Sequence, residues 1–169
     1  MKKLFVPVVV TTILASNFAI VGNTAAAISE DQAGVISMTC GSVQLQLKNL
    51  QKTDSRVRVF LGSKYEFALT NLMTNLNLRL IRNNRPSSLL AASQSTFSNE
   101  RDFFKTAFTD YSKSLDALLS INCRLNPYDF YNQLEITREK REIVRQSCLR
   151  LKDVLSDHRT TVVNLKDDL

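Results

Sequence analysis

The sequence is poor in residues that interrupt helices. Its 169 residues include only four glycines (22, 34, 41 and 62) and three prolines (7, 86 and 127). Because glycine and proline are the usual helix breakers, this scarcity favours long, uninterrupted helices. Neither strand periodicity nor an internal repeat competes with that interpretation. We therefore expect an all-α protein.

Histidine and cysteine are too few and too far apart for a metal centre or a nucleophilic site. The single histidine, His158, follows Cys148 by ten residues on one expected helix, roughly 15 Å by helical rise. That is too far for one pair of metal ligands or one catalytic dyad. Phosphate-loop, serine-elbow and zinc motifs are also missing. We expect a non-enzyme with no catalytic residue, no metal and no cofactor.

Charge of one sign does not dominate any segment. The formal net charge is +6, and without the two lysines of residues 1–27 it is +4, with 20 basic against 16 acidic residues. Residues 127–169 carry eight of each sign. This balance does not support a dedicated nucleic-acid surface, so we expect no nucleic-acid partner.

Residues 1–27 have the pattern of a secretory signal peptide. Lys2 and Lys3 precede a largely apolar stretch from Leu4 to Val21, and Ala25–Ala27 supply small residues for cleavage. We expect export to the periplasm or the cell exterior, with a single helical domain over residues 28–169. The alternative is an uncleaved anchor, because the apolar stretch approaches the length that spans a bilayer. A membrane contact is expected only in that case.

Heptad-like spacing predicts three long helices, at about 29–84, 88–121 and 127–166. Ser29 to Gln32 forms a capping box at the first start. Asn and Pro residues separate the helices near 83–88 and 122–127. We call the line of apolar residues along one side of each helix its seam. In the first helix the heptad spacing of the seam changes by one residue near Gly62, which predicts a local relaxation of the supercoil. The third seam alternates spacings of four and three at Phe130, Leu134, Thr137, Arg141, Val144, Cys148, Leu151, Leu155, His158, Val162 and Leu165.

Two short connections make neighbouring helices antiparallel. We therefore predict an elongated, coiled-coil-like, antiparallel up-down-up three-helix bundle. In that topology Cys123 lies at the same end as Cys40, whereas Cys148 lies roughly 37 Å further along the third helix. Export permits a disulfide. We predict a Cys40–Cys123 disulfide and a free, buried thiol at Cys148.

Three charged residues fall on apolar seams: Asp54, Arg101 and Arg141. They form either internal ion pairs and snorkelling side chains, which we favour, or a register device or polar slot that receives a ligand. The charged run from Glu135 to Arg145 has the spacing of a solvated helix face with pairs three and four residues apart.

The distal end of the first helix is the best candidate for a partner surface in the sequence, because polar and basic residues gather there. An alternative reading is that bases in a last helical turn only complement the helix dipole. The candidate residues are Asn75, Arg79, Arg82, Asn83, Asn84 and Arg85.

A set of residues spread over most of residues 28–169 carries a resemblance to other proteins: Cys40, Leu47, Leu50, Asp54, Arg58, Leu61, Gly62, Tyr65, Glu66, Leu76, Asn77, Arg79, Leu80, Cys123, Pro127, Phe130 and Tyr131. In these residues the chain resembles uncharacterised secreted helical proteins of small-genome bacteria. The resemblance implies export and helices, and it carries no activity.

Three hypotheses for function remain open at this level. The first is a non-enzymatic exported bundle that binds an unidentified envelope or secreted protein. The second is a periplasmic holdase chaperone, which would expose apolar grooves to unfolded clients. The third is a membrane spacer, which would require an uncleaved segment from Lys2 to Val21.

Overall fold

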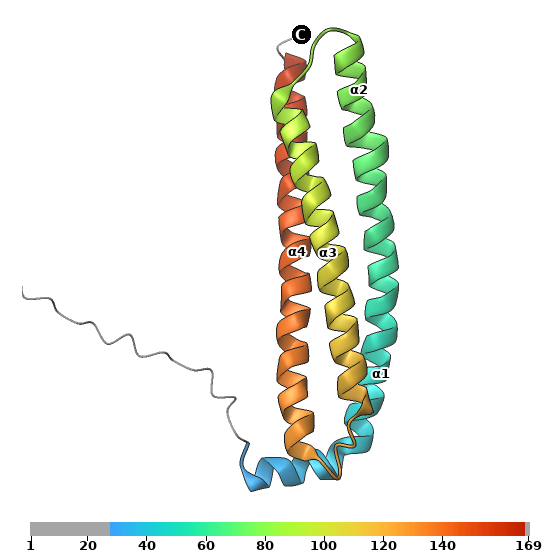
Figure 1. Ribbon diagram of the computed structural model, residues 1–169, viewed down its shortest axis with the longest axis vertical. Coiled ribbons are helices and arrows are strands. Elements are labelled where there is room, and N and C mark those ends of the chain that lie inside the picture. The colour runs from blue at the N-terminus through green and yellow to red at the C-terminus, as the bar shows by residue number, and fades with distance from the viewer. Residues whose placement is uncertain (1–27, 168–169) are drawn as a thin grey trace, which may run out of the picture.

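The computed structural model describes residues 28–167 and shows three long helical rods joined by two short connections (Figure 1). The first rod comprises α1 (Glu30–Phe67), the π-helix η1 (Ala68–Thr74) and α2 (Asn75–Arg82). The second is α3 (Ser88–Ser120), and the third is α4 (Pro127–Asp167). The described residues contain no strand, and the all-α up-down-up bundle is confirmed. The expected signal peptide lies outside the described residues.

The helix starts follow the local signals. The Ser29 hydroxyl accepts a hydrogen bond from the Gln32 amide, and the Gln32 side chain accepts one from the Ser29 amide, as in a capping box. Ser87 caps α3 by accepting from the Leu90 amide. The start of α4 is Pro127, whose missing amide hydrogen costs nothing in a first helical turn.

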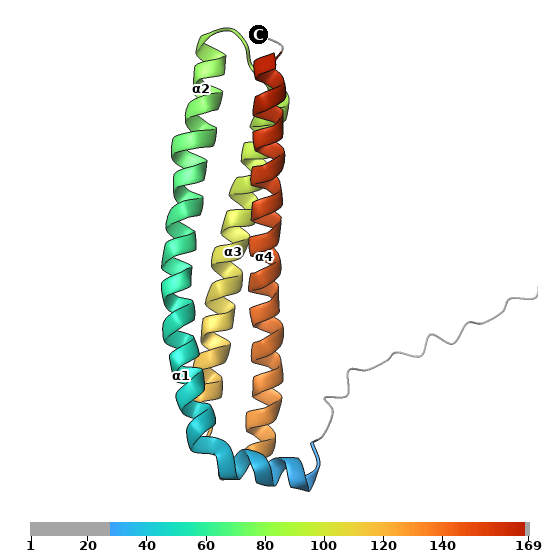
Figure 2. The same ribbon diagram turned by 180° about the vertical axis from the view of Figure 1, so that it is seen from behind.

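The first rod bends near its start. Figures 1 and 2 show the beginning of α1 crossing beneath the bundle before the helix turns to run along it. Helical hydrogen bonding continues through this region. The disulfide between Cys40 and Cys123 ties α1 to the α3–α4 connection, as predicted. The Ser37 hydroxyl also donates to the Arg124 carbonyl there.

The extra residue of the first seam is absorbed in η1. The sequence places the phase shift near Gly62, whereas the π-helix begins six residues later, at Ala68. A π-helix widens the hydrogen-bonded turn by one residue, so the apolar face continues on the same side beyond it. The Thr74 hydroxyl donates to the Leu69 carbonyl five residues earlier, at 2.8 Å.

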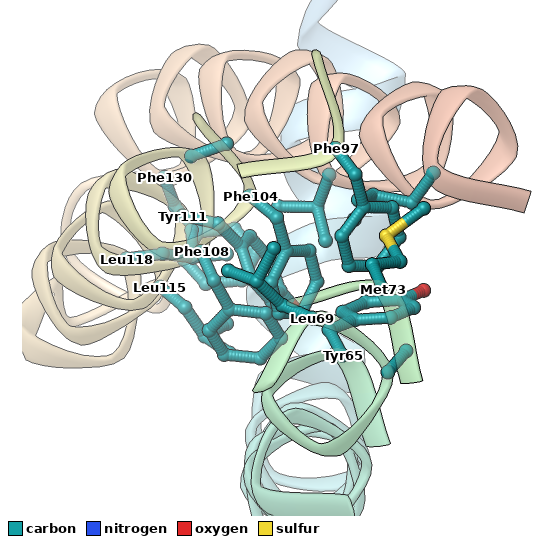
Figure 3. Packing of buried hydrophobic residues seen from close by; sticks show 14 of the residues in the cluster. Tyr65, Leu69, Met73, Phe97, Phe104, Phe108, Tyr111, Leu115, Leu118 and Phe130 are labelled. Carbon is teal, nitrogen blue, oxygen red and sulfur yellow. The ribbon is translucent and has the colours of Figure 1, made fainter. Parts of the chain in front are cut away.

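Aromatic side chains fill the core between the first rod and α3. Tyr65 packs edge-on against Phe97 and Phe104, and the stack continues to Phe108 and Tyr111 (Figure 3). Such edge-to-face pairs favour a fixed ring arrangement. Their bulk holds α1 away from α3.

The α3–α4 interface is closer because small side chains lie in it. Ser114 and Thr137 share a buried hydrogen bond of 2.9 Å, and Ser147 is fully buried on α4. As a result α3 and α4 make the most extensive helix contact, while α1 contacts α4 much less. The bundle is therefore asymmetric, with its open side between α1 and α4.

Candidate functional site

Three hollows follow one another along the boundary between the first rod and α4, and we call them together the α1–α4 groove. The lower hollow, about 400 Å³, lies between Ile36 and Val43 of α1 and Phe130 of α4. The middle hollow, about 340 Å³, lies between Val57 and the α4 residue Val144. The upper hollow, about 360 Å³, joins residues 71–79 to residues 158–163.

The groove arises because α1 and α4 run in the same direction without packing closely. Both rods rise from the end that holds the disulfide (Figures 1 and 2). Residue numbers consequently increase together along both sides between the middle and upper hollows, from residue 138 to residue 163 on α4. At 1.5 Å per residue this span on α4 is about 38 Å, long enough to seat a helix, whereas the lower hollow lies against the bent start of α1.

The floor of the middle hollow is apolar. Its walls include Leu61 of α1, Phe104 and Phe108 of α3, and Val144 of α4. Both phenylalanines are almost completely shielded from solvent, with 2% and 4% of their surface exposed. A ligand in this hollow would therefore have to present apolar surface to the floor.

A polar bridge crosses the same hollow. Asp54 accepts a 2.7 Å hydrogen bond from the Tyr111 hydroxyl and pairs with Arg141, whose Nε lies 3.0 Å from Oδ2. Burial, followed by this hydrogen bond, raises the pKa of Tyr111 above its usual range. The separate hydrogen bond that Arg141 donates to Asp54 raises the pKa of Arg141. The internal ion-pair interpretation of Asp54 and Arg141 is thus confirmed.

The third charged seam residue, Arg101, also pairs across the bundle. Its Nη1 lies 3.0 Å from Glu66 Oε2 on α1, and the Arg101 side chain is only 14% exposed. The mostly buried Arg101 guanidinium is thus matched by a carboxylate that is 49% exposed, as the ion-pair interpretation predicts.

Cys148 lines the middle hollow and is the free cysteine of the described chain. It is partly buried, not fully buried as its seam position predicts. The neighbouring Ser147 is fully buried instead. Cys148 lies at the boundary between α1 and α4, where these two helices do not pack closely. Burial raises the pKa of Tyr65, and contact with the Cys148 thiol raises it further. The reactivity of the free Cys148 thiol can therefore indicate whether the middle hollow is occupied.

The structure divides the predicted tip surface into two parts, although all six of its residues are exposed. Asn75 and Arg79 line the upper hollow. Asn83 and Asn84 instead form the helix end: the Asn83 side chain donates to the Arg79 carbonyl, and Asn84 adopts a positive φ of 54°. The Arg85 amide donates to the Leu80 carbonyl, completing a Schellman-type cap. Arg82 lies in the last turn before this cap.

Four basic side chains on α4 recur every seven residues. Counting the acidic and basic residues of a whole segment does not reveal this spacing. We call Arg138, Arg145, Lys152 and Arg159 the basic row. Arg138 and Arg145 line the middle hollow, and Arg159 lines the upper one. In the run from Glu135 to Arg145 the predicted pairs three residues apart are present, Arg138 with Glu135 and Arg145 with Glu142, whereas no ion pair four residues apart forms and Thr137 and Val144 are buried. Its basic side nevertheless faces the groove.

The described residues hold no cluster of three or more potential metal ligands from histidine, cysteine, aspartate or glutamate. No helix among them is long and apolar enough to cross a bilayer. Comparisons with family models, with curated proteins and with solved structures find no match for this chain.

Proposed function

We propose that this protein is an exported, non-enzymatic binding protein that receives a helix of an envelope or surface protein in its α1–α4 groove. The observation that carries the proposal is the succession of three hollows along one side of the bundle. A helix laid there would complete a local four-helix arrangement with the three rods. Helix-in-groove binding uses apolar residues at spacings of three and four against such a floor.

The disulfide supports the exported part of the proposal. Cys40 and Cys123 are bonded, and structural disulfides persist mainly in oxidising compartments. It also fixes the lower end of the groove, because it ties the start of α1 to the connection that precedes α4.

A holdase chaperone is the second candidate, favoured by large apolar side chains that α1 leaves in solvent. Met38 is 84% exposed, Val59 72% and Phe60 61%. Together with the apolar floor of the α1–α4 groove, these side chains would offer contacts to many unfolded clients.

Site-specific photo-crosslinking in exporting cells distinguishes the two. A photoreactive residue would replace Lys152 in the basic row, Arg82 at the tip, or Lys113, which is exposed on α3 and lies outside the groove. We expect one dominant captured protein from Lys152 and little from Lys113. Many unrelated exported proteins, captured equally from all three positions and enriched under unfolding stress, would favour the chaperone instead.

A further inference from the structure

We infer that the occupant of the α1–α4 groove is an acidic amphipathic helix of a partner protein, an inference that rests on the proposed function. The groove combines an apolar floor with a basic edge. Its floor in the middle hollow is formed by residues such as Leu61 and Phe108. Three members of the basic row lie on its α4 walls, Arg138 and Arg145 in the middle hollow and Arg159 in the upper one. A helix with one apolar face and acidic residues beside that face complements both.

The basic row lies in one line because its spacing equals the heptad. Arg138, Arg145, Lys152 and Arg159 are successive members of a seven-residue repeat, so they occupy one side of α4. All four are exposed. Since the first two line the middle hollow and the last lines the upper one, the line follows the groove.

The charges of this row remain available to a partner. Lys152 and Arg159 make no ion pair within residues 28–167. Arg138 and Arg145 pair only with glutamates three residues earlier on their own helix. Such exposed ion pairs contribute little to stability, so both arginines can pair with a partner's acids instead.

The acids on the walls of the middle hollow are already matched, whereas Asp31 of the lower hollow makes no ion pair within residues 28–167. Asp54 is held by Arg141 and Tyr111, and Glu142, also on the wall of the middle hollow, is held by Arg145. The α1 residues of that hollow, Asp54, Val57 and Leu61, bring no other acid. A nucleic acid would match the basic row but would leave the apolar floor uncovered, so a protein helix is favoured.

The test uses the purified full chain and two synthetic helices of about 20 residues, roughly 30 Å long. Both carry the same leucine face, flanked by glutamates in one peptide and by lysines in the other. Fluorescence anisotropy of the labelled peptides measures affinity, and the rate of Cys148 alkylation by a maleimide reports groove occupancy. We expect the acidic peptide to bind at least about tenfold more tightly, to lose affinity with salt and to slow Cys148 alkylation.

Two charge-reversed proteins separate the basic row from net charge. The double variant Lys152→Glu, Arg159→Glu should lose the preference for the acidic peptide. The control Lys52→Glu, Lys113→Glu changes the net charge equally at exposed positions outside the groove and should keep it. Circular dichroism would verify that both fold.

Equal binding of the two peptides, binding of neither, or acidic binding without protection of Cys148 would each overturn the inference. Tighter binding of a labelled oligonucleotide that depends on Lys152 would overturn it in favour of nucleic acid. Protection of Cys148 that rises with protein concentration alone would overturn it in favour of a second copy. In all these cases a dominant protein crosslinked from Lys152 in cells would still support the proposed function. Failure of the inference can therefore be told apart from failure of the proposed function.

Discussion

At the scale of single residues, Asp54 joins all three rods. It lies on α1, accepts from Tyr111 of α3 and pairs with Arg141 of α4. Its side chain is 15% exposed, whereas that of Arg141 is 53% exposed. Losing its partner would therefore cost the mostly buried Asp54 carboxylate more free energy than it would cost the Arg141 guanidinium, which can be solvated by water.

We predict that Asp54→Ala lowers the free energy of unfolding by about 1–3 kcal/mol, because the almost fully buried Tyr111 hydroxyl loses its acceptor. Arg141→Ala should cost less than about 1 kcal/mol, as is usual for exposed ion pairs. Urea denaturation of the two variants measures the difference. An equal or larger loss for Arg141→Ala would show that the ion pair, not the hydroxyl, dominates this bridge.

His158 makes stability depend on pH. Burial lowers its pKa below 6.5, and its Nδ1 lies 3.2 Å from the Ser93 hydroxyl oxygen. The charged groups beside it on the upper hollow are Arg79 and Arg159, both basic. Because the unfolded chain then takes up the proton first, stability is fully present above about pH 6.5 and declines below it, until the folded-state histidine is also protonated.

The variant His158→Gln should have a flatter stability profile between about pH 7 and pH 5.5, measured by urea denaturation. Glu142, whose pKa is lowered to about 2 by Arg145 and Gln146, contributes only at more acidic pH. The variant Glu142→Gln is therefore the control and should keep the slope of the parent protein in this window. A parent slope that survives in His158→Gln would rule out the histidine as its source.

At the scale of elements, η1 shows how the first rod keeps one face toward the bundle. The π-helix holds the extra residue, and beyond it the Asn77 side chain donates to Gln94 Oε1 while Gln94 Nε2 donates to Thr74. The sequence predicts that an extra residue exists, because the seam shifts by one. The sequence places this extra residue near Gly62, because the apolar spacing changes there, whereas the wider hydrogen-bonded turns begin at Ala68.

Removing one residue from η1 should be tolerated better than removing one from regular helix. Deleting the exposed Asn71 converts the π-helix to α-helix with both flanking faces unchanged, so we expect a cost of about 1 kcal/mol or less. Deleting Arg56, also exposed, rotates everything beyond it by about 100° and should abolish cooperative folding. Thermal denaturation followed by circular dichroism compares them. Equal losses would mean that η1 is not the site of the extra residue.

The disulfide stabilises the end of the bundle where α1 bends. In the chain-entropy model, Cys40→Ser should lower the free energy of unfolding by about 2–5 kcal/mol. It should also raise the number of thiols that alkylate in denaturant from one, Cys148, to two, counted by mass spectrometry. The control Cys148→Ser should leave the disulfide intact. A count of one in Cys40→Ser would refute the pairing.

At the scale of the whole molecule, much of the fold could be predicted from sequence because its signals are local. Ser29 and Gln32 mark the start of the first helix, Pro86 and Pro127 mark the connections, and the heptad spacing predicts three helices packed in up-down-up order. The disulfide followed from topology, since up-down-up order places Cys40 beside the second connection.

The groove could not be predicted, because it depends on how unequally the helices pack. The heptad pattern places Phe104 and Thr137 alike on inward seams, although one side chain is bulky and the other small, and it leaves the buried Ser114 off the seam. In the structure the aromatics separate α1 from α3, and the small Ser114 and Thr137 draw α3 and α4 together. Counting charges by segment likewise hid the basic row, since residues 127–169 carry eight acids and eight bases. The seven-residue spacing of Arg138, Arg145, Lys152 and Arg159 was the signal that could have identified it.

The most direct measurement is the rate at which Cys148 reacts with a membrane-permeable maleimide in exporting cells, compared with the purified protein. Lys113→Cys in a Cys148→Ser background provides an exposed control thiol on α3. If the α1–α4 groove is the binding surface, Cys148 should react several-fold more slowly in cells than in the purified protein. The thiol of Lys113→Cys should show no such slowing. Equal slowing of both thiols, or none at Cys148, would contradict a role for the groove in binding.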